Sequence, residues 1–137
     1  MNKNFTHNVK VYYEDTDAGG VVYYANYLKY LERARTEALS TIGLSNTKIK
    51  NDFGAFIIVK SCNIEYKKSA YLEDDLQIKS FVDFTSKTSL LMNQSIFKDE
   101  QLIVEAKIHL VFINEKFKPL KIPEKIHSDY QPYTSSS

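Results

Sequence analysis

Residues 24–43, which read YANYLKYLERARTEALSTIG, decide how the rest of the chain is expected to fold. Apolar side chains recur there every three or four residues and fall on one side of a helical wheel: Tyr27, Leu28, Leu31, Ala34, Ala38, Leu39 and Ile42. Gly43 follows the last apolar position and is a normal helix stop. The spacing predicts one amphipathic helix over residues 24–42, about five turns long at 3.6 residues per turn.

Segments with the period-two alternation of β-strands lie on both sides of this helix. One precedes it, at residues 5–13, and a polar loop at residues 44–52 follows it. The alternation then returns in four segments: residues 54–66, 75–85, 88–98 and 101–114. Short polar breaks between the later segments predict antiparallel hairpins. The order predicts an α+β fold in which a five-stranded antiparallel sheet is wrapped around one long helix.

Strict alternation also predicts which strand residues share a face. It places Cys62 and Ile64 on the same face as Phe56 and Ile58, and it places Phe84 beside Val82. Several positions on the outward face are apolar as well: Phe81, Val111 and Ile113. Exposed apolar patches usually mark interfaces, so we expect an oligomer.

Composition bounds the class of protein. With 137 residues, 43% of them hydrophobic, we expect a single domain at residues 1–133 and a disordered tail at residues 134–137. The 18 basic and 17 acidic residues give a net charge of +1, which argues against a nucleic-acid partner. The single cysteine, Cys62, excludes an internal disulfide, and the chain offers neither a signal peptide nor a membrane span of about 20 apolar residues. We therefore expect a cytoplasmic protein.

The segment at residues 12–27 has an unusual composition, with three carboxylates, two glycines and five tyrosines between a strand and a helix. A calcium-binding loop of the EF-hand type would explain Asp15, Asp17 and Gly20 at its positions 1, 3 and 6. Positions 5 and 12 of such a loop supply metal ligands, position 12 usually a glutamate, but here they are Gly19 and Asn26, so we expect no metal.

Two interpretations of this segment remain open on the residues alone. Acidic residues are stabilised at a helix N-terminus, and two glycines let the chain turn, so the segment can be purely structural. Alternatively, Gly19 and Gly20 let a ligand approach the backbone, and the free amides of the first helical turn polarise its carbonyl group. Asp17 then stands beside them as a nucleophile or general base for acyl transfer. The spacing shows no Ser-His-Asp or Cys-His arrangement.

Residues 11–28, VYYEDTDAGGVVYYANYL, and the following ERARTE at residues 32–37 resemble the signature of the hot-dog acyl-CoA thioesterases. The chain is most similar to the 4-hydroxybenzoyl-CoA thioesterase group and its YbgC-like branch, which is associated with the Tol–Pal system. A looser similarity includes VKSCNIEY at residues 59–66 and KPL at residues 118–120.

The resemblance implies a mechanism and an assembly. The catalytic carboxylate of the family falls on Asp17, which attacks the thioester carbonyl or activates water, and the amide near Tyr24 steadies the oxyanion. The family needs no metal or redox cofactor, because CoA is part of the substrate. It forms homodimers with continuous sheets, often paired into homotetramers, and it binds acyl-CoA at subunit interfaces.

The chain departs from the family pattern at two positions. YbgC-like members usually carry histidine where this chain has Tyr24, although the 4-hydroxybenzoyl-CoA type has tyrosine there, and Ser69 stands where many relatives have proline. A backbone-amide role survives the first change, so the chemistry is expected to depend on Asp17. Residues 14–42 contain no histidine, which argues against the related hot-dog dehydratases.

The expected binding residues fall into two groups. Around the reacting group they are Gly19, Gly20, Val22, Tyr23 and Asn26. For the CoA phosphates they are Lys60, Lys87, Thr88 and Ser89. Arg35 lies within the apolar stripe of the helix, and we expect it to form a structural ion pair with Glu32.

The favoured function is hydrolysis of acyl-CoA to the free acid and CoA. The alternatives are a thioesterase acting on acyl carrier protein and a non-catalytic module that binds acyl-CoA or acyl carrier protein. Tyr24 in place of histidine favours the binding module, whereas Asp17 beside Gly19 and Gly20 favours an enzyme. The acyl group is not determined by the sequence.

Overall fold

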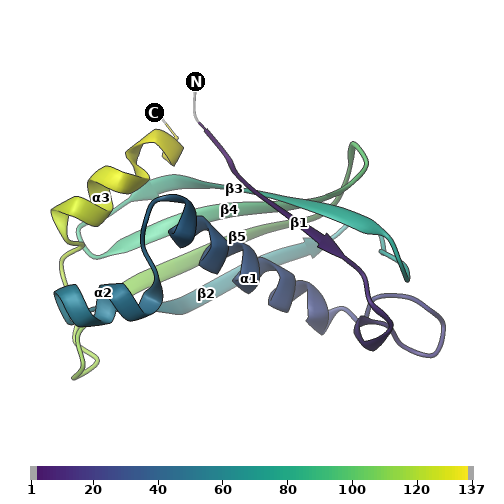
Figure 1. Ribbon diagram of the computed structural model, residues 1–137, viewed down its shortest axis with the longest axis horizontal. Helices are drawn as coiled ribbons and strands as arrows, with labels where there is room; N and C mark the ends of the chain where they lie inside the picture. The colour runs from purple at the N-terminus through teal and green to yellow at the C-terminus, as the bar shows by residue number, and fades with distance from the viewer. Residues whose placement is uncertain (1–2, 136–137) are drawn as a thin grey trace.

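The long helix α1, Ala25–Thr41, lies across one face of an antiparallel sheet (Figure 1). The computed structural model describes residues 3–135. The five strands are β1 Phe5–Lys10, β2 Phe56–Tyr66, β3 Asp75–Thr85, β4 Ser89–Lys98 and β5 Gln101–Ile113. They pair in the order β1-β3-β4-β5-β2, so β1 and β2 are the two edges. The predicted α+β arrangement of one long helix and a five-stranded antiparallel sheet is confirmed.

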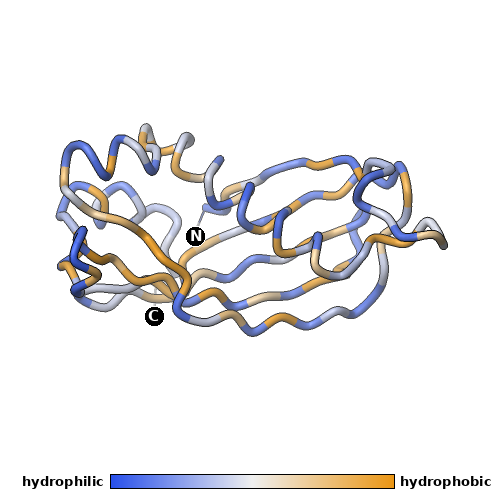
Figure 2. The backbone as a smooth tube through the Cα atoms, turned by 90° about the horizontal axis from the view of Figure 1, so that it is seen from below, coloured by the Kyte–Doolittle hydropathy of each residue, from blue (hydrophilic) through white to orange (hydrophobic). Residues whose placement is uncertain are grey.

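The core fills the space between α1 and the sheet. Figure 2 shows hydrophobic and hydrophilic residues alternating along the strands, as a sheet with one covered face requires. Leu31 of α1 and Ile78, Leu90 and Phe112 of the sheet are completely buried, and each such side chain contributes about 1.5–3 kcal/mol to folding. One position on the helix was predicted wrongly: Leu28 is 45% exposed, whereas Tyr30 is buried.

Two β-bulges overturn the predicted strand faces. The pairing of β2 with β5 shifts between Val59 and Ser61, and an extra residue there reverses the alternation that follows it. As a result Cys62, opposite buried Ile108, faces α1 together with Val59, whereas Ile58 faces away. A second bulge, between Val82 and Phe84, turns Phe84 outward, where it is 58% exposed.

Two further helices lie at one end of the sheet (Figure 1). The segment predicted as a polar loop contains α2, Asn46–Phe53, which Ser45 caps by accepting a hydrogen bond from the Lys48 amide at 3.0 Å. After β5 the chain forms α3, Glu124–Tyr130, which the sequence analysis missed. Both were missed because each buries only one or two side chains: Ile49 in α2, and Ile126 and Tyr130 in α3.

The ends of two predicted segments also differ. The first strand stops at Lys10 rather than at residue 13, because Tyr13–Asp15 form a 3-10 turn. A second 3-10 turn, Gln131–Tyr133, precedes the predicted tail. Within that tail the Ser135 amide donates to the Val82 carbonyl at 2.7 Å, and residues 136–137 lie outside the described residues.

Candidate active site

The loop between β1 and α1 carries Asp17 at the start of a tight turn. The Asp17 amide donates to the Val21 carbonyl and the Gly20 amide donates to the Asp17 carbonyl, both at 3.0 Å. Gly20 has φ +77°, a left-handed conformation that glycine adopts without strain. These backbone bonds set the position of Asp17 without using its side chain.

The Asp17 carboxylate is exposed and held from one side. Its Oδ1 accepts a hydrogen bond from the Gly19 amide at 2.8 Å. A Cβ on residue 19 would lie 3.4 Å from the same oxygen, so glycine leaves the approach open. Oδ2 has no hydrogen-bond partner among residues 3–135, which leaves it available to attack a carbonyl carbon or take a proton from water.

Asp15 ties the same loop to α1. Its carboxylate is buried and accepts from the Tyr12 amide at 2.9 Å. Its carbonyl accepts from Asn26 Nδ2 at 2.7 Å and from the Tyr23 amide at 3.1 Å. Burial, and then the neighbouring Asp15 carboxylate, raise the pKa of the Tyr30 hydroxyl on the next turn of the helix. The loop is therefore held in place by a side chain of the helix that follows it, Asn26.

The first turn of α1 presents free donors. Tyr24 is the N-cap residue, and its side chain makes no capping hydrogen bond. The Tyr24 amide has no hydrogen-bond partner in the part of the chain that the structure describes, as is usual for the first amides of a helix. Such amides, together with the positive end of the helix dipole, can receive a carbonyl oxygen that gains negative charge.

Tyrosine rings surround this helix end. The ring centres of Tyr23 and Tyr24 are 5.1 Å apart, and that of Tyr66 on β2 is 5.9 Å from that of Tyr24. The Tyr66 hydroxyl donates to the Tyr24 carbonyl at 3.5 Å. Tyr23 and Tyr24 are more than half exposed, so their rings form an accessible aromatic surface beside Asp17's turn.

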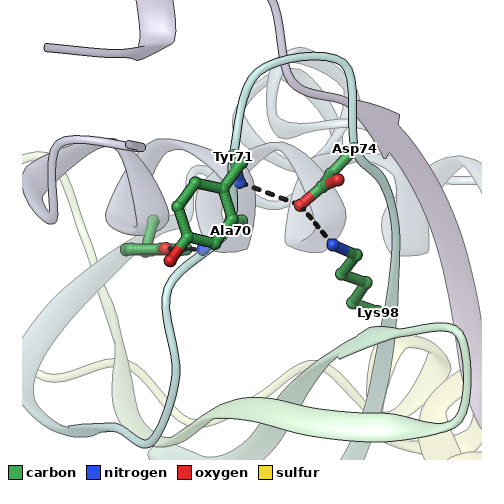
Figure 3. A network of polar contacts seen from close by, with 5 residues as sticks. Ala70, Tyr71, Asp74 and Lys98 are labelled. Atoms are coloured by element: carbon green, nitrogen blue, oxygen red, sulfur yellow. Dashed lines mark hydrogen bonds and ion pairs between the residues drawn. The ribbon is translucent and has the colours of Figure 1, made fainter. Parts of the chain in front are cut away.

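A neighbouring segment, residues 70–74, supports the turn from the other side. The Val22 amide donates to the Ala70 carbonyl at 2.9 Å, and the Ala70 amide donates to the Tyr27 hydroxyl at 2.8 Å. Asp74 accepts from the Tyr71 amide at 2.8 Å and pairs with Lys98 at 3.1 Å, and both contacts are drawn in Figure 3. This support could not be predicted from the sequence, because nothing in the local pattern of residues 70–74 indicates which loop they contact.

With this geometry in place, the chain can be compared with known proteins. A family model described as thioesterase-like superfamily matches residues 11–129. This chain belongs to the thioesterase-like superfamily. The acyl-CoA thioester hydrolase YbgC of Escherichia coli O157:H7 is 39% identical over 125 residues, covering 90% of this chain and 92% of the relative. The acyl-CoA thioesterase YbgC of Haemophilus influenzae is 32% identical over 131 residues, covering 95% and 96%.

Solved structures of thioesterases have the same fold. A probable thioesterase from Bartonella henselae superposes with a TM-score of 0.84 at 32% identity, covering 88% of this chain and 100% of that one. A 1,4-dihydroxy-2-naphthoyl-CoA thioesterase from Synechocystis gives a TM-score of 0.86 at 25% identity, covering 94% and 96%. The predicted hot-dog fold and the predicted thioesterase family are confirmed.

In this thioesterase-like chain the residues expected around the reacting group divide into two sets. Gly19, Gly20 and Tyr23 lie on the exposed loop with Asp17. Val22 is 4% exposed and belongs to the core, and Asn26 is 8% exposed with its amide bonded to Asp15. Because both side chains are buried, Val22 and Asn26 stabilise the loop and are not exposed to a ligand.

The residues expected to bind CoA phosphates are also divided. Lys60, Thr88 and Ser89 line one hollow of about 350 Å³ on the sheet face away from α1. Lys87 lies instead in a second hollow of about 190 Å³, with Lys121 and His127. The two hollows share no lining residue, so Lys87 is not brought together with the other three.

Arg35 has a different partner from the one predicted. Its Nη1 donates to Gln94 Oε1 at 2.9 Å, and it forms no ion pair with Glu32 or another carboxylate of residues 3–135. Gln94 is completely buried, and its Nε2 donates to the Leu31 carbonyl at 3.0 Å and to Ser80 Oγ at 3.1 Å. A polar residue at an inward position of β4 was the signal in the sequence that could have identified this partner.

Two other features concern metals and membranes. Within residues 3–135 no three His, Cys, Asp or Glu side chains gather closely enough to hold a metal ion. No helix in that range is long and apolar enough to span a bilayer.

Proposed function

We propose that this protein hydrolyses acyl-CoA thioesters to the free acid and CoA, with Asp17 as the catalytic carboxylate. The observation that carries the proposal is the exposed carboxylate, held by the Gly19 amide at 2.8 Å, in the loop that leads to the free amide at the start of α1. The YbgC relatives named as acyl-CoA thioesterases, aligned over nine-tenths or more of this chain, support the substrate class.

The chemistry needs no group outside this loop and helix end. The thioester oxygen lies against the amide of Tyr24, where the helix dipole stabilises the charge that develops on it. Asp17 either takes a proton from a water that attacks the carbonyl carbon, or attacks the carbon itself to give an anhydride that water then hydrolyses. In both routes the C–S bond breaks and CoA leaves as its thiolate. Neither route needs a metal or redox cofactor.

The free edge of β2 supports a proposed assembly. One side of β2 pairs with β5, and no strand of residues 3–135 pairs with the other. Three of its apolar side chains are exposed: Ile58, Val59 and Tyr66. A long apolar edge strand is normally covered, so we propose that two copies pair along β2 as a homodimer. The outer-face residues Phe84 and Ile58 supply an apolar surface through which two dimers pair as a tetramer.

The location and the carrier of the acyl group are also part of the proposal. A protein with one free cysteine, Cys62, suits the reducing cytoplasm. A thioester on acyl carrier protein has the same reacting carbonyl as one on CoA, so the loop and helix end would act on both. The Lys60 hollow favours CoA, because a lysine beside two hydroxyl side chains suits phosphate.

The deciding experiment measures thiol release from acyl-CoAs that range from acetyl to long-chain and aromatic esters. We expect release by the wild-type protein and none by Asp17→Asn. Glu14→Gln is the matched control, because it removes another exposed carboxylate of the same loop. Equal activity of wild type and Asp17→Asn would disprove the role of Asp17, and release only from carrier-protein esters would change the substrate.

A further inference from the structure

A cavity of about 170 Å³ lies between α1 and the sheet, away from the Asp17 loop. Its walls come from α1, α2, α3 and three strands, and they include Arg35, Leu39, Val59 and Tyr130. A cavity of about 150 Å³ is enough to take up benzene, so this one holds a group of about six non-hydrogen atoms. Val59, in its wall, is 48% exposed on β2, so the cavity opens toward the free edge of the sheet.

Arg35 brings a positive charge into this mainly apolar space. Gln94 accepts one of the five N–H donors of the guanidinium. No carboxylate of residues 3–135 forms an ion pair with it, and Glu32, the acidic residue in the lining, is exposed to solvent. Burial lowers the pKa of Arg35, which reflects the cost of keeping the charge there. A guanidinium with free donors in a half-enclosed cavity favours a ligand that supplies an acceptor oxygen.

The course of β2 relates the cavity to the catalytic loop. Tyr66, at the end of β2, contacts Tyr24 at the start of α1, whereas Val59, near the start of β2, lines the cavity. Within one chain, Arg35 lies about 16 Å along the helix from Tyr24, at 1.5 Å per residue. In the proposed antiparallel dimer, a pairing centred near the middle of β2 brings the first half of the second copy's β2 beside Tyr66. The cavity of one copy then adjoins the catalytic end of the other.

We propose, on the basis of the proposed hydrolase function and dimer, that this cavity binds the acyl group of the thioester cleaved at Asp17 of the second copy. Arg35 makes the cavity selective for acyl groups of about six carbons that end in an oxygen function, either a carboxylate or a hydroxyl. Leu39 and Val59 contact the methylene groups, and the guanidinium donates to the terminal oxygen.

The test compares three CoA esters of equal length: hexanoyl, 6-hydroxyhexanoyl and adipoyl. For the wild-type protein we expect kcat/KM for at least one oxygen-ended ester to exceed that for hexanoyl by about tenfold or more, because a site built for a hydrogen bond rejects the analogue that lacks it. Arg35→Met should abolish this preference, and Arg33→Met, on the exposed side of α1, should keep it. A wild-type protein that cleaves hexanoyl-CoA equally well or better would overturn the proposal, as would a preference that survives Arg35→Met.

A second variant covers the case in which Arg35→Met fails to fold. Val59→Phe adds volume at a half-exposed position in the cavity wall. We expect it to reduce kcat/KM for six-carbon esters at least about tenfold more than kcat/KM for acetyl-CoA, because a two-carbon group does not reach the cavity. Equal effects on both esters, or no effect on either, would contradict a role of the cavity in binding the acyl group.

A binding measurement separates this inference from the proposed function. This measurement applies if the wild-type protein releases no thiol from any ester. Free adipate and free 6-hydroxyhexanoate are then titrated by calorimetry into three proteins: wild type, the control Arg33→Met and a cavity variant. The cavity variant is Arg35→Met or, if that protein fails to fold, Val59→Phe. Binding to wild type and Arg33→Met, but not to the cavity variant, would retain the cavity as an oxygen-ligand site while the hydrolase proposal fails. Absence of binding in all three would overturn both.

Discussion

The two ends of α1 are built in different ways. At the N-terminal end, Asp17, Tyr23 and Tyr24 are exposed and are positioned by backbone hydrogen bonds. Toward the other end, α2 and α3 close the fold and bury Ile49 and Ile126 almost completely (Figure 1). The groups that we propose to react thus lie where the chain leaves donors and a carboxylate open to solvent, and much of the apolar packing lies at the opposite end of the helix. Variants at the two ends should therefore affect different properties.

The largest effect is expected from Asp17→Asn. The amide keeps an acceptor for the Gly19 amide but can no longer act as a base or nucleophile, so kcat should fall on the order of 10²–10⁴-fold. The melting temperature should stay within about 2 °C, because the side chain is exposed. Steady-state kinetics and thermal unfolding of the same preparations check both. A large loss of stability would mean that Asp17 supports the fold.

Asn26→Ala should affect both stability and rate, because Asn26 joins the loop to the helix. The change removes the bond from Nδ2 to the Asp15 carbonyl, which keeps the Tyr23 amide as a donor, so the loss is that of one hydrogen bond, about 0.5–1.5 kcal/mol of unfolding free energy. We expect kcat to fall more than KM rises, since a loosened loop misplaces Asp17. Urea unfolding and kinetics test this, with Asn51→Ala, an exposed asparagine of α2, as the control. Full activity of Asn26→Ala would show that the loop holds its shape without this bond.

Alkaline pH should destabilise both ends through buried tyrosines. Burial raises the pKa of Tyr30 and of Tyr130 above the ordinary value of 10.0. The folded state therefore holds these protons when the unfolded state releases them, so the stability is complete below pH 10 and is lost as the pH rises above it. Each group contributes at most about 1.4 kcal/mol per pH unit in that range. Denaturant unfolding between pH 8 and 12 should show a shallower loss for Tyr30→Phe than for wild type. An unchanged slope would place the proton release elsewhere.

Ser45→Ala should change stability alone, at the end of the fold away from the chemistry. Loss of the cap on α2 removes the bond to the Lys48 amide and costs about 1 kcal/mol. Thermal unfolding should record this decrease, and kcat/KM for short acyl esters should remain that of wild type. A parallel loss of activity would show that the two ends of the molecule are coupled.

Tyr24→Phe should have the smallest effect. The phenyl ring keeps the edge contact with Tyr66, and the backbone amide assigned to the oxyanion is unchanged. The expected change in kcat is less than about twofold, since only a hydroxyl without a catalytic role is lost. A decrease of tenfold or more would instead assign the Tyr24 hydroxyl a part in proton transfer.

The sequence predicted most of this architecture because long segments have strong periodicity. The helix at residues 24–42 and the four later strands follow directly from the period of their apolar residues, and the loop at residues 12–27 stands out by composition. The predictions failed where one residue changes the phase, as at the bulge after Val59, and where a helix buries few side chains, as in α2. A bulge leaves almost no trace in the sequence, since it depends on how two strands fit together.

The sequence by itself determined the fold class and the family, and it pointed to the carboxylate that we propose as catalytic, because these follow from periodicity and from a dense local motif. Tertiary structure alone decided which neighbours support that motif. Val22 and Asn26 are motif residues that turn inward, and Gln94, from a distant strand, takes the place predicted for Glu32 beside Arg35. Contacts between residues about 60 positions apart depend on the packing of the helix on the sheet, and local patterns do not record them.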